Sequence, residues 1–547
     1  MLYSKIVSAL TKVFKKENPL SPPECNHLTA LRGDTVSFQV VYLSDENLKC
    51  KVNILSEFGK NVICRSVESV PSNYPGDPAA MYKDGNYIKT SGCEFPDILR
   101  SLRGGNLKIF KNKYRSIWID VEVPENQPAG IYEIKIELFL ADGTVLATNT
   151  QKITVYAASL PPARLIHTEW FHTDCLADYY GYEVFSEKHW KAIENFMRLA
   201  AKRGINMILT PIFTPPLDTE IGGERTTVQL VDVSFRNNKW SFGFDKLTRW
   251  FDTADKCGIK YFEISHLFTQ WGANAAPKIM AAYKGKYKRV FGWDTRVEDG
   301  EYPDFLSKFL PALTAYLKSS GRADKCYFHV SDEPNLDNME NYIRAKNIIA
   351  PYLEGFHMMD ALSSYEFYET GACQMPIPAS NHIEPFIEHG VKNLWTYYCV
   401  SQNTYVSNRF MAMSLARTRA IGVQMFKYRI AGFLQWGFNF YNTALSKEHI
   451  NPYKVTDAGG KFPSGDPFIV YPGANGKPEE SIRMMAFFSA QQDLRALTAL
   501  AEKTSYEYVM NIVEDGLSDP ITFKNYPHSD YYYINLRNRI NRELARK

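Results

Sequence analysis

Eight strand-like segments, most of them followed by a helix-like segment, alternate between residues 164 and 438 of this 547-residue chain. Several of the helix-like segments carry apolar residues at helical spacing and stop at a glycine, as at Gly204 and Gly258. Eight such repeats over roughly 270 residues match the size of a (β/α)8 barrel. An open doubly wound sheet is the alternative, but no glycine-rich phosphate turn follows any of the strands. The pattern therefore predicts an α/β fold built on a TIM-like (β/α)8 barrel. The eight expected strands lie within residues 164–171, 205–213, 259–265, 325–334, 356–361, 373–378, 393–400 and 431–438.

The segments on either side of this alternation follow different patterns. Residues 28–158 hold short runs rich in β-branched and aromatic residues, separated by turn residues, which is typical of a β-sandwich. Residues 481–503 form an amphipathic helical pattern. We therefore expect an N-terminal all-β sandwich domain over residues 1–160 and a catalytic barrel over residues 161–445. A small, mostly helical C-terminal region over residues 446–547 is expected to pack on the barrel.

Charge and composition exclude several classes of partner. The 63 Lys and Arg residues and 60 Asp and Glu residues are mixed along the chain, so nothing favours a nucleic acid. No run of 18 apolar residues occurs, so we expect no membrane span. The N-terminus lacks the apolar core of a signal peptide, and the chain as written reads as cytoplasmic, with a trimmed signal peptide left open. The oligomeric state stays open.

The cysteines do not indicate a metal site. No Cys-x-x-Cys occurs and the spacing matches no zinc pattern, so we expect reduced thiols, no metal and no cofactor. The nine cysteines are Cys25, Cys50, Cys64, Cys93, Cys175, Cys257, Cys326, Cys373 and Cys399.

Polar and aromatic residues follow the ends of the expected barrel strands. Active sites of (β/α)8 barrels lie where strands end and βα loops begin, so these residues are expected to converge on one rim. Aromatic faces beside polar groups suit a sugar, and the expected partner is a glycan or glycoconjugate. The candidate substrate-binding residues are Trp170, His172, His266, Trp271, Asp360, Trp395, Tyr397, Tyr398, Trp436 and Asn439.

The sharpest local signal is the run CYFHVSDEPN over residues 326–335, in which an apolar strand leads directly into Asp332 and Glu333. Neighbouring side chains on a regular strand point to opposite faces, so both carboxyl groups reach one ligand only where the strand breaks. Pro334 favours such a break. An acidic start of a helix is the structural alternative for the same two residues. We predict that Asp332 and Glu333 are the catalytic carboxyl pair.

The segment after the seventh strand, NLWTYYCVSQNT, contains no carboxylate. A two-carboxylate retaining glycosidase needs an acid/base and a separate nucleophile about 5 Å apart. In substrate-assisted catalysis the 2-acetamido group of the sugar attacks instead, through an oxazoline intermediate. The enzyme then needs one carboxyl group to protonate the leaving oxygen and one carboxylate to orient the acetamido group. Two adjacent acidic residues supply both.

Three segments of the chain resemble glycoside hydrolase family 123, a family of β-N-acetylgalactosaminidases and their relatives. They are HVSDEPN, VPENQPAGIYEIKIELF and GFLQWGFNFYN, and the resemblance extends to the helix SIRMMAFFSAQQDLRALTAL. The resemblance implies that Asp332 orients the acetamido group and that Glu333 is the general acid/base. It also implies that Tyr397 or Tyr398 contacts the acetamido group or closes the sugar pocket, and that Trp436 forms the pocket floor.

The expected function is a retaining glycoside hydrolase that releases β-linked N-acetylhexosamine, with N-acetylgalactosamine favoured. Two alternatives stay open. One is a conventional two-carboxylate glycosidase with Glu333 as acid/base and a nucleophile from Glu366, Glu369 or Glu384. The other is a carbohydrate-binding barrel without catalytic activity. The sequence leaves open the choice between the two amino sugars, exo or endo action, and the natural glycan.

Overall fold

The computed structural model describes residues 1–19, 27–298 and 300–546, so Cys25 lies outside the described residues. Its centre is a parallel barrel in the strand order β20-β19-β18-β15-β12-β11-β22-β21. A bridge between Ala379 and Tyr397 links β20 to β21, with the Ser380 amide donating to the Tyr397 carbonyl at 2.8 Å, and closes the ring. The predicted α/β barrel is confirmed, with one strand in each of the eight expected segments. The strands are β11 (Ile166–Glu169), β12 (Met207–Thr210), β15 (Tyr261–Ile264), β18 (Cys326–Phe328), β19 (His357–Ala361), β20 (Met375–Ile377), β21 (Trp395–Tyr397) and β22 (Gly432–Gln435).

Helices surround the barrel, and their ends follow the capping signals in the sequence. Helix α3 starts at Ser186, whose side chain accepts a hydrogen bond from the His189 amide. Helix α4 ends at Gly258, which adopts the left-handed conformation (φ 96°) that favours glycine. Their apolar faces are buried against the strands. The helices around the barrel are α2 (Thr173–Tyr180), α3 (Glu187–Lys202), α4 (Asp245–Cys257), α5 (Glu301–Ser319), α6 (Met339–Ile349), α7 (Glu366–Glu369), α8 (Glu384–Glu388) and α9 (Leu415–Lys427).

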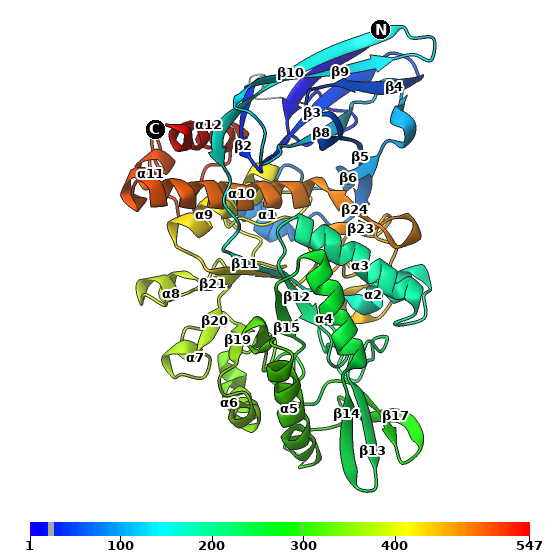
Figure 1. Ribbon diagram of the computed structural model, residues 1–547, viewed down its shortest axis with the longest axis vertical. Helices are drawn as coiled ribbons and strands as arrows, with labels where there is room; N and C mark the ends of the chain where they lie inside the picture. The colour runs from blue at the N-terminus through cyan, green and yellow to red at the C-terminus, as the bar shows by residue number, and fades with distance from the viewer. Residues whose placement is uncertain (20–26, 299, 547) are drawn as a thin grey trace.

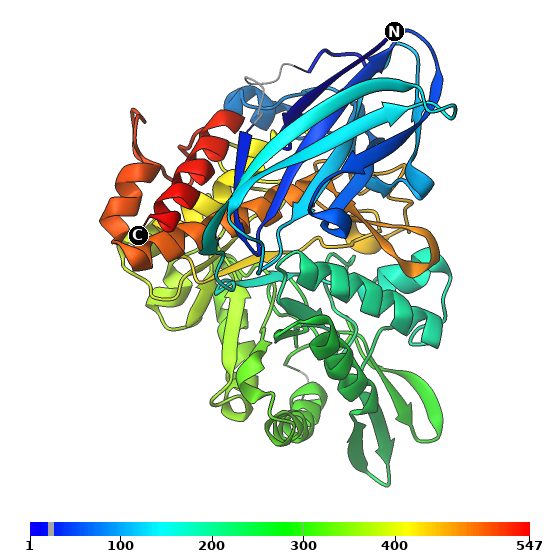
Figure 2. The ribbon, with the colours of Figure 1, turned by 45° about the horizontal axis from the view of Figure 1, so that its top comes forward.

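Two βα loops together form a small mixed sheet, with antiparallel hairpins joined by a parallel pair. The loop between β12 and α4 forms the hairpin β13 (Asp232–Arg236) and β14 (Lys239–Gly243). The loop between β15 and α5 forms the hairpin β16 (Ile279–Tyr283) and β17 (Lys286–Phe291). The two hairpins pair through β13 and β16 into the order β14-β13-β16-β17. They project from the barrel at the end of the molecule opposite the N-terminal sandwich (Figures 1 and 2).

The N-terminal region is β-rich, as predicted, and packs as two sheets around an apolar core. One sheet has the order β1-β3-β8-β5-β6-β24-β23 and the other β2-β10-β9-β4-β7. Strands β23 and β24 come from after the barrel, so the chain returns to the sandwich once the barrel is complete. The strands are β1 (Leu2–Ser8), β2 (His27–Arg32), β3 (Thr35–Ser44), β4 (Leu48–Leu55), β5 (Val62–Ser72), β6 (Cys93–Ser101), β7 (Asn106–Ile109), β8 (Arg115–Glu122), β9 (Gly130–Phe139), β10 (Val145–Ser159), β23 (Val470–Pro472) and β24 (Pro478–Ser481), with helix α1 (Pro78–Asp84) after β5.

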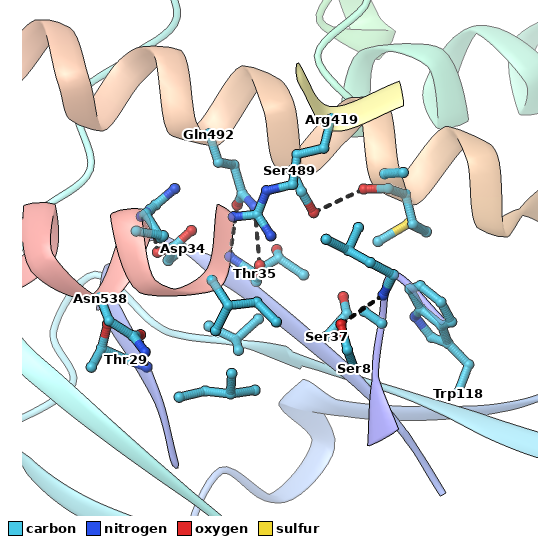
Figure 3. A pocket seen from close by; sticks show the side chains of 18 residues that line it. Ser8, Thr29, Asp34, Thr35, Ser37, Trp118, Arg419, Ser489, Gln492 and Asn538 are labelled. Atoms are coloured by element: carbon cyan, nitrogen blue, oxygen red, sulfur yellow. Dashed lines mark hydrogen bonds and ion pairs between the residues drawn. The ribbon is translucent and has the colours of Figure 1, made fainter. Parts of the chain in front are cut away.

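Helix α10 (Ile482–Lys503) lies between the sandwich and the barrel, with α11 (Tyr506–Val513) and α12 (Asp530–Ala545) beside it (Figures 1 and 2). Polar contacts fix the sandwich to these helices. The Gln492 side chain accepts from the Thr35 amide at 2.8 Å and donates to the Thr35 carbonyl at 3.0 Å (Figure 3). A cavity of about 60 Å³ beside them, lined in part by Asp34 and Arg419, is the size of a water site. This interface holds the barrel and the sandwich in one arrangement.

Candidate active site

A cavity of about 650 Å³ opens at the ends of the barrel strands, where the βα loops begin. Its volume lies within the range of sites for small ligands. Of the twelve residues predicted for the site, six line this cavity: Trp170, Trp271, Asp332, Glu333, Tyr397 and Trp436. The structure therefore brings together residues from the first, third, fourth, seventh and eighth strands.

Asp332 and Glu333 lie where the chain leaves β18 and no longer follows strand geometry. Glu333 has φ 42°, the left-handed region, and this turn allows neighbouring side chains to open on the same cavity. The Trp271 amide donates to the Asp332 carbonyl at 3.1 Å and ties the loop to the one after β15. The Tyr397 hydroxyl donates to Glu333 Oε1 at 2.7 Å, and the Cys399 thiol lies 3.9 Å from the same oxygen. Strained backbone of this kind occurs at functional sites.

Burial and mutual repulsion act together on the two acids. Burial raises the pKa of Asp332 well above its usual range, and the neighbouring Glu333 carboxylate raises it further. Burial likewise raises the pKa of Glu333, against the lowering effect of its bond from Tyr397. The pair therefore holds one shared proton over a pH range in which isolated carboxyl groups are both ionised.

A buried charge network lies behind the pair. His329, on the same loop, bonds through Nε2 to Glu263 Oε1 at 2.7 Å and through Nδ1 to Asp360 Oδ1 at 3.0 Å. Burial alone lowers the pKa of His329, but these two bonds outweigh it and raise the pKa to about 10. The same Glu263 oxygen accepts from Trp170 Nε1 at 2.7 Å. Through Glu263, the protonated His329 thus holds the Trp170 ring in the cavity wall. It also places a positive charge near Asp332.

A second buried network holds Trp436. Its Nε1 donates to Asp466 Oδ2 at 2.8 Å, and burial raises the pKa of Asp466 to about 7. The Arg409 guanidinium donates to the Gly437 carbonyl at 2.6 Å and pairs with Glu169 at 2.9 Å. Because its N–H group is held by Asp466, the Trp436 ring presents a fixed face to the cavity.

The other six predicted substrate-binding residues do not line the cavity. Three of them hold the loops behind it. The His172 ring bonds to the Trp436 carbonyl at 2.8 Å, and Asn439 bridges the backbone of His172 at 2.8 and 3.0 Å. Asp360 is bound to His329 and accepts from the Tyr342 hydroxyl at 2.7 Å.

The remaining three are packed in the protein interior. The His266 ring stacks on His329 with centroids 4.3 Å apart, and burial and that positive ring keep the pKa of His266 well below its usual value. Trp395, at the start of β21, packs inside the barrel against Tyr327. Tyr398 points away from the barrel axis and packs on Phe433. The alternation along β21 explains why Tyr397 faces the cavity and its neighbour does not.

Several residues of the cavity wall carried no signal in the sequence. Asp218 and Gln270 come from the two hairpin-bearing loops, and the Asp218 amide donates to the Gln270 side chain at 2.6 Å. Lys461 and Phe462 come from the long loop after β22. Such loops have no periodic pattern that would place their side chains. His329, which lies behind the cavity wall, was not predicted either, although it directly follows an apolar strand three residues before Asp332.

One group of metal-ligating side chains occurs among the described residues: His266, His329 and Asp360 lie within 4.8 Å of one another. Both ring nitrogens of His329 are already bound to carboxylates, and its raised pKa keeps both protonated. A protonated imidazole offers no lone pair to a metal. The group fits an ion-pair network rather than a metal centre.

The acids considered as conventional nucleophiles lie elsewhere. Glu366 and Glu369 are exposed on α7, and Glu384 pairs with Lys524 at 3.0 Å. The cavity lining contains two further carboxylates, the partly buried Asp218 and the exposed Glu448. Burial raises the pKa of Asp218 to about 6, and the Leu445 amide and Arg225 oppose this rise. Neither Asp332 nor Glu333 contributes to the shift. Asp466 is buried and its pKa is raised in part by the Glu333 charge, but it accepts a hydrogen bond from Trp436 Nε1 and does not line the cavity.

No helix in the described part of the chain has both the length and the apolar character needed to cross a bilayer.

Two family models match the chain. The model described as the glycoside hydrolase 123 catalytic domain matches residues 170–500, and the glycoside hydrolase 123 N-terminal domain matches residues 7–139. A solved family 123 glycoside hydrolase from Clostridium perfringens has a TM-score of 0.74 at 17% identity and covers 100% of this chain and 98% of that one. A Parabacteroides merdae β-glucuronidase, 9% identical and covering 88% of this chain and 51% of that one, has a TM-score of 0.31. No curated protein matches the sequence. The catalytic model covers more than half of the chain, and the chain therefore belongs to glycoside hydrolase family 123 and is a glycoside hydrolase.

Proposed function

We propose that this glycoside hydrolase releases β-linked N-acetylhexosamine with retention of configuration, N-acetylgalactosamine being favoured, and that the 2-acetamido group of the substrate is the nucleophile. The observation that carries the proposal is the adjacent pair Asp332 and Glu333 on one cavity. The partly buried Asp218 also lines the cavity, but neither acid of the pair contributes to the shift of its pKa. Two acids side by side are what substrate assistance requires, whereas a conventional retaining enzyme needs a second acid across the anomeric carbon.

In the first step, Asp332 accepts the acetamido N–H and Glu333 gives its proton to the glycosidic oxygen. The acetamido carbonyl oxygen forms a bond to the anomeric carbon as the bond to the leaving oxygen breaks, giving an oxazolinium ion. In the second step, the Glu333 carboxylate takes a proton from water, whose oxygen opens the ring at the anomeric carbon. Retention follows from the two successive inversions.

The surroundings of the pair suit these roles. Tyr397 donates to Glu333 Oε1, so Oε2, which bonds to none of the described residues, can carry the transferred proton. Burial and the Glu333 charge raise the pKa of Asp332, whereas the positive His329 lowers it and so favours the ionised Asp332 that the proposed mechanism needs. An acid held protonated beside an ionised neighbour is the arrangement that general-acid catalysis at neutral pH needs.

The aromatic residues divide by position. Trp170 and Trp436, with their N–H groups bound to Glu263 and Asp466, are proposed to enclose the sugar that carries the acetamido group. Trp271 is 42% exposed at the rim and is proposed to stack on the leaving group. We propose that His172, Asp360 and Asn439 position these residues without touching the sugar.

Paired aryl glycosides test the proposal. The enzyme is expected to cleave aryl β-N-acetylgalactosaminide, to cleave the gluco epimer more slowly, and to leave aryl β-galactoside intact, since the latter lacks the nucleophile. A thiazoline that mimics the intermediate should inhibit competitively. Cleavage of the plain galactoside at a comparable rate would show a conventional mechanism. The Clostridium perfringens structure is described in terms of glycolipid glycan hydrolysis, so glycolipid glycans are the natural substrates to test first.

A further inference from the structure

The two hairpins that project from the barrel bring five cationic side chains to their tips. Arg236 and Lys239 flank the turn between β13 and β14, and Lys284, Lys286 and Lys288 lie at or beside the turn between β16 and β17. All five are exposed. Because Phe235 pairs with Tyr283 in parallel register, the two turns lie side by side. We call these five residues the hairpin-tip cluster.

The hairpin-tip cluster is not neutralised by nearby acids. None of its members forms an ion pair with a described residue. The acids at the base of the sheet are already engaged: Asp232 pairs with Lys246, and Asp294 pairs with Arg289 at 2.8 Å. Lys288 and Lys284 instead lie over the Tyr283 ring, 4.5 and 5.4 Å from its centroid. The tips of the two hairpins thus carry a concentrated positive patch.

The sheet is oriented toward the side of the barrel on which the cavity opens. Trp240, near the tip of the β13–β14 hairpin, packs on Phe305 in the first turns of α5. Phe244, which follows β14 at the other end of the hairpin, stacks on Tyr316 near the C-terminal end of α5. The N-terminal ends of barrel helices lie on the same side as the C-terminal ends of the strands. The tips therefore project on the cavity side. The same two loops supply Asp218 and Trp271 to the cavity wall.

We propose that the hairpin-tip cluster is a second binding site, for an acidic glycan chain that bears sulfate or carboxylate groups. Clustered Lys and Arg side chains recognise polyanions of this kind through charge. The turns contain the polar residues Asn237 and Asn238 together with Gly285, and Tyr287 beside them is 68% exposed, an aromatic ring on which a sugar can stack. Polybasic patches alone anchor proteins to membranes weakly. The choice of a glycan rests on the proposed function. A chain bound at the tips is held at a raised local concentration near the cavity.

Binding of the full-length enzyme to chondroitin sulfate, to polygalacturonate and to neutral dextran tests this proposal. The variant K284Q/K286Q/K288Q removes three cations. The matched control K49Q/K51Q/K108Q removes three exposed lysines, which also lack ion-pair partners among the described residues, from β4 and β7 of the sandwich. A cation near a dense anionic surface contributes about fivefold to affinity, so the tip variant should bind the acidic chain about 100-fold more weakly at low salt. The control variant should bind as the wild type does.

The acidic chain that binds more tightly shows whether the hairpin-tip cluster prefers sulfate or carboxylate groups. The neutral dextran should not bind. Equal affinity of the tip variant and the control variant would overturn the proposal, as would the absence of binding to both acidic chains. Stronger binding to phosphatidylserine vesicles than to either chain would assign the patch to membranes and also overturn it. Turnover of a small aryl substrate should be unchanged in both variants. Because binding is measured without turnover, failure of this proposal is distinguishable from failure of the proposed function.

Discussion

Replacement of Tyr397 by phenylalanine removes a single hydrogen bond from the acid/base while keeping the ring that lines the cavity. The Tyr397 hydroxyl lies 2.7 Å from Glu333 Oε1 and stabilises the glutamate most when it is ionised, that is, as its proton leaves in the transition state. A hydrogen bond to a charged group is worth about 1.5–3 kcal/mol. Tyr397→Phe should therefore lower kcat/KM on a natural disaccharide roughly 10- to 150-fold.

The pH dependence gives a second readout of the same variant. Burial raises the pKa of Glu333 and the Tyr397 hydroxyl lowers it, so loss of the hydroxyl raises that pKa. Because Glu333 acts first as an acid, activity is lost as pH rises through its pKa, and the basic limb of the kcat/KM profile should move to higher pH.

The neighbouring Tyr398 supplies a matched control. Its ring is buried and its hydroxyl has no hydrogen-bond partner among the described residues. Tyr398→Phe should leave both kcat/KM and the pH profile unchanged. Equal effects of the two substitutions, or a Tyr397→Phe enzyme with wild-type rate and profile, would refute the reasoning about Glu333.

Four further substitutions test the pair and the fold. Glu333→Gln should lower hydrolysis of natural glycans by about 10²- to 10⁴-fold but affect formation of the intermediate much less for aryl substrates with good leaving groups, and equal losses on both substrate types would contradict its role as the acid. Asp332→Asn should lose rate with an unchanged Tm, and a collapsed Tm would show a structural role instead. Gly432→Ala places a Cβ 2.0 Å from the Trp395 ring inside the barrel and should cost about 1–3 kcal/mol in the free energy of unfolding, measured by denaturant titration; an unchanged free energy would contradict the packing. Burial raises the pKa of the largely buried Glu480, but Arg65 and Arg203 lower it to about 2, so Glu480→Gln should cost about 3–5 kcal/mol at neutral pH. That difference should shrink as pH falls from about 4.5 to about 2, because the wild type then loses the ion pairs, and a constant difference in acid would exclude this origin.

The barrel could be predicted from the sequence because its evidence is periodic and local. Each strand is a short apolar run, and each of several helices has a capping residue such as Ser186 or a stop such as Gly258. Asp332 and Glu333 stood out because they interrupt an apolar strand directly before a proline. Signals of this kind involve only neighbouring residues and need no knowledge of the rest of the chain.

The rest of the site depends on contacts between distant segments. Asp466, which holds Trp436, and Asp218, which lines the cavity, come from loops without periodicity. The ten candidate substrate-binding residues were chosen because they lie near the ends of expected strands. That position did not separate Tyr397, which faces the cavity, from Tyr398, which faces away. The return of β23 and β24 to the sandwich also had no local signal, because a sheet edge is completed by partners that are far away in sequence.

In the proposed mechanism, the substrate's own amide attacks the anomeric carbon beside Asp332 and Glu333. The most direct test is the turnover of aryl N-acetylgalactosaminides whose acetyl group carries one, two or three fluorine atoms. Fluorine withdraws electrons from the carbonyl oxygen, so the account predicts that kcat falls steeply with each added fluorine. A kcat that is independent of fluorination would contradict it, because the carbonyl oxygen would then not be the nucleophile.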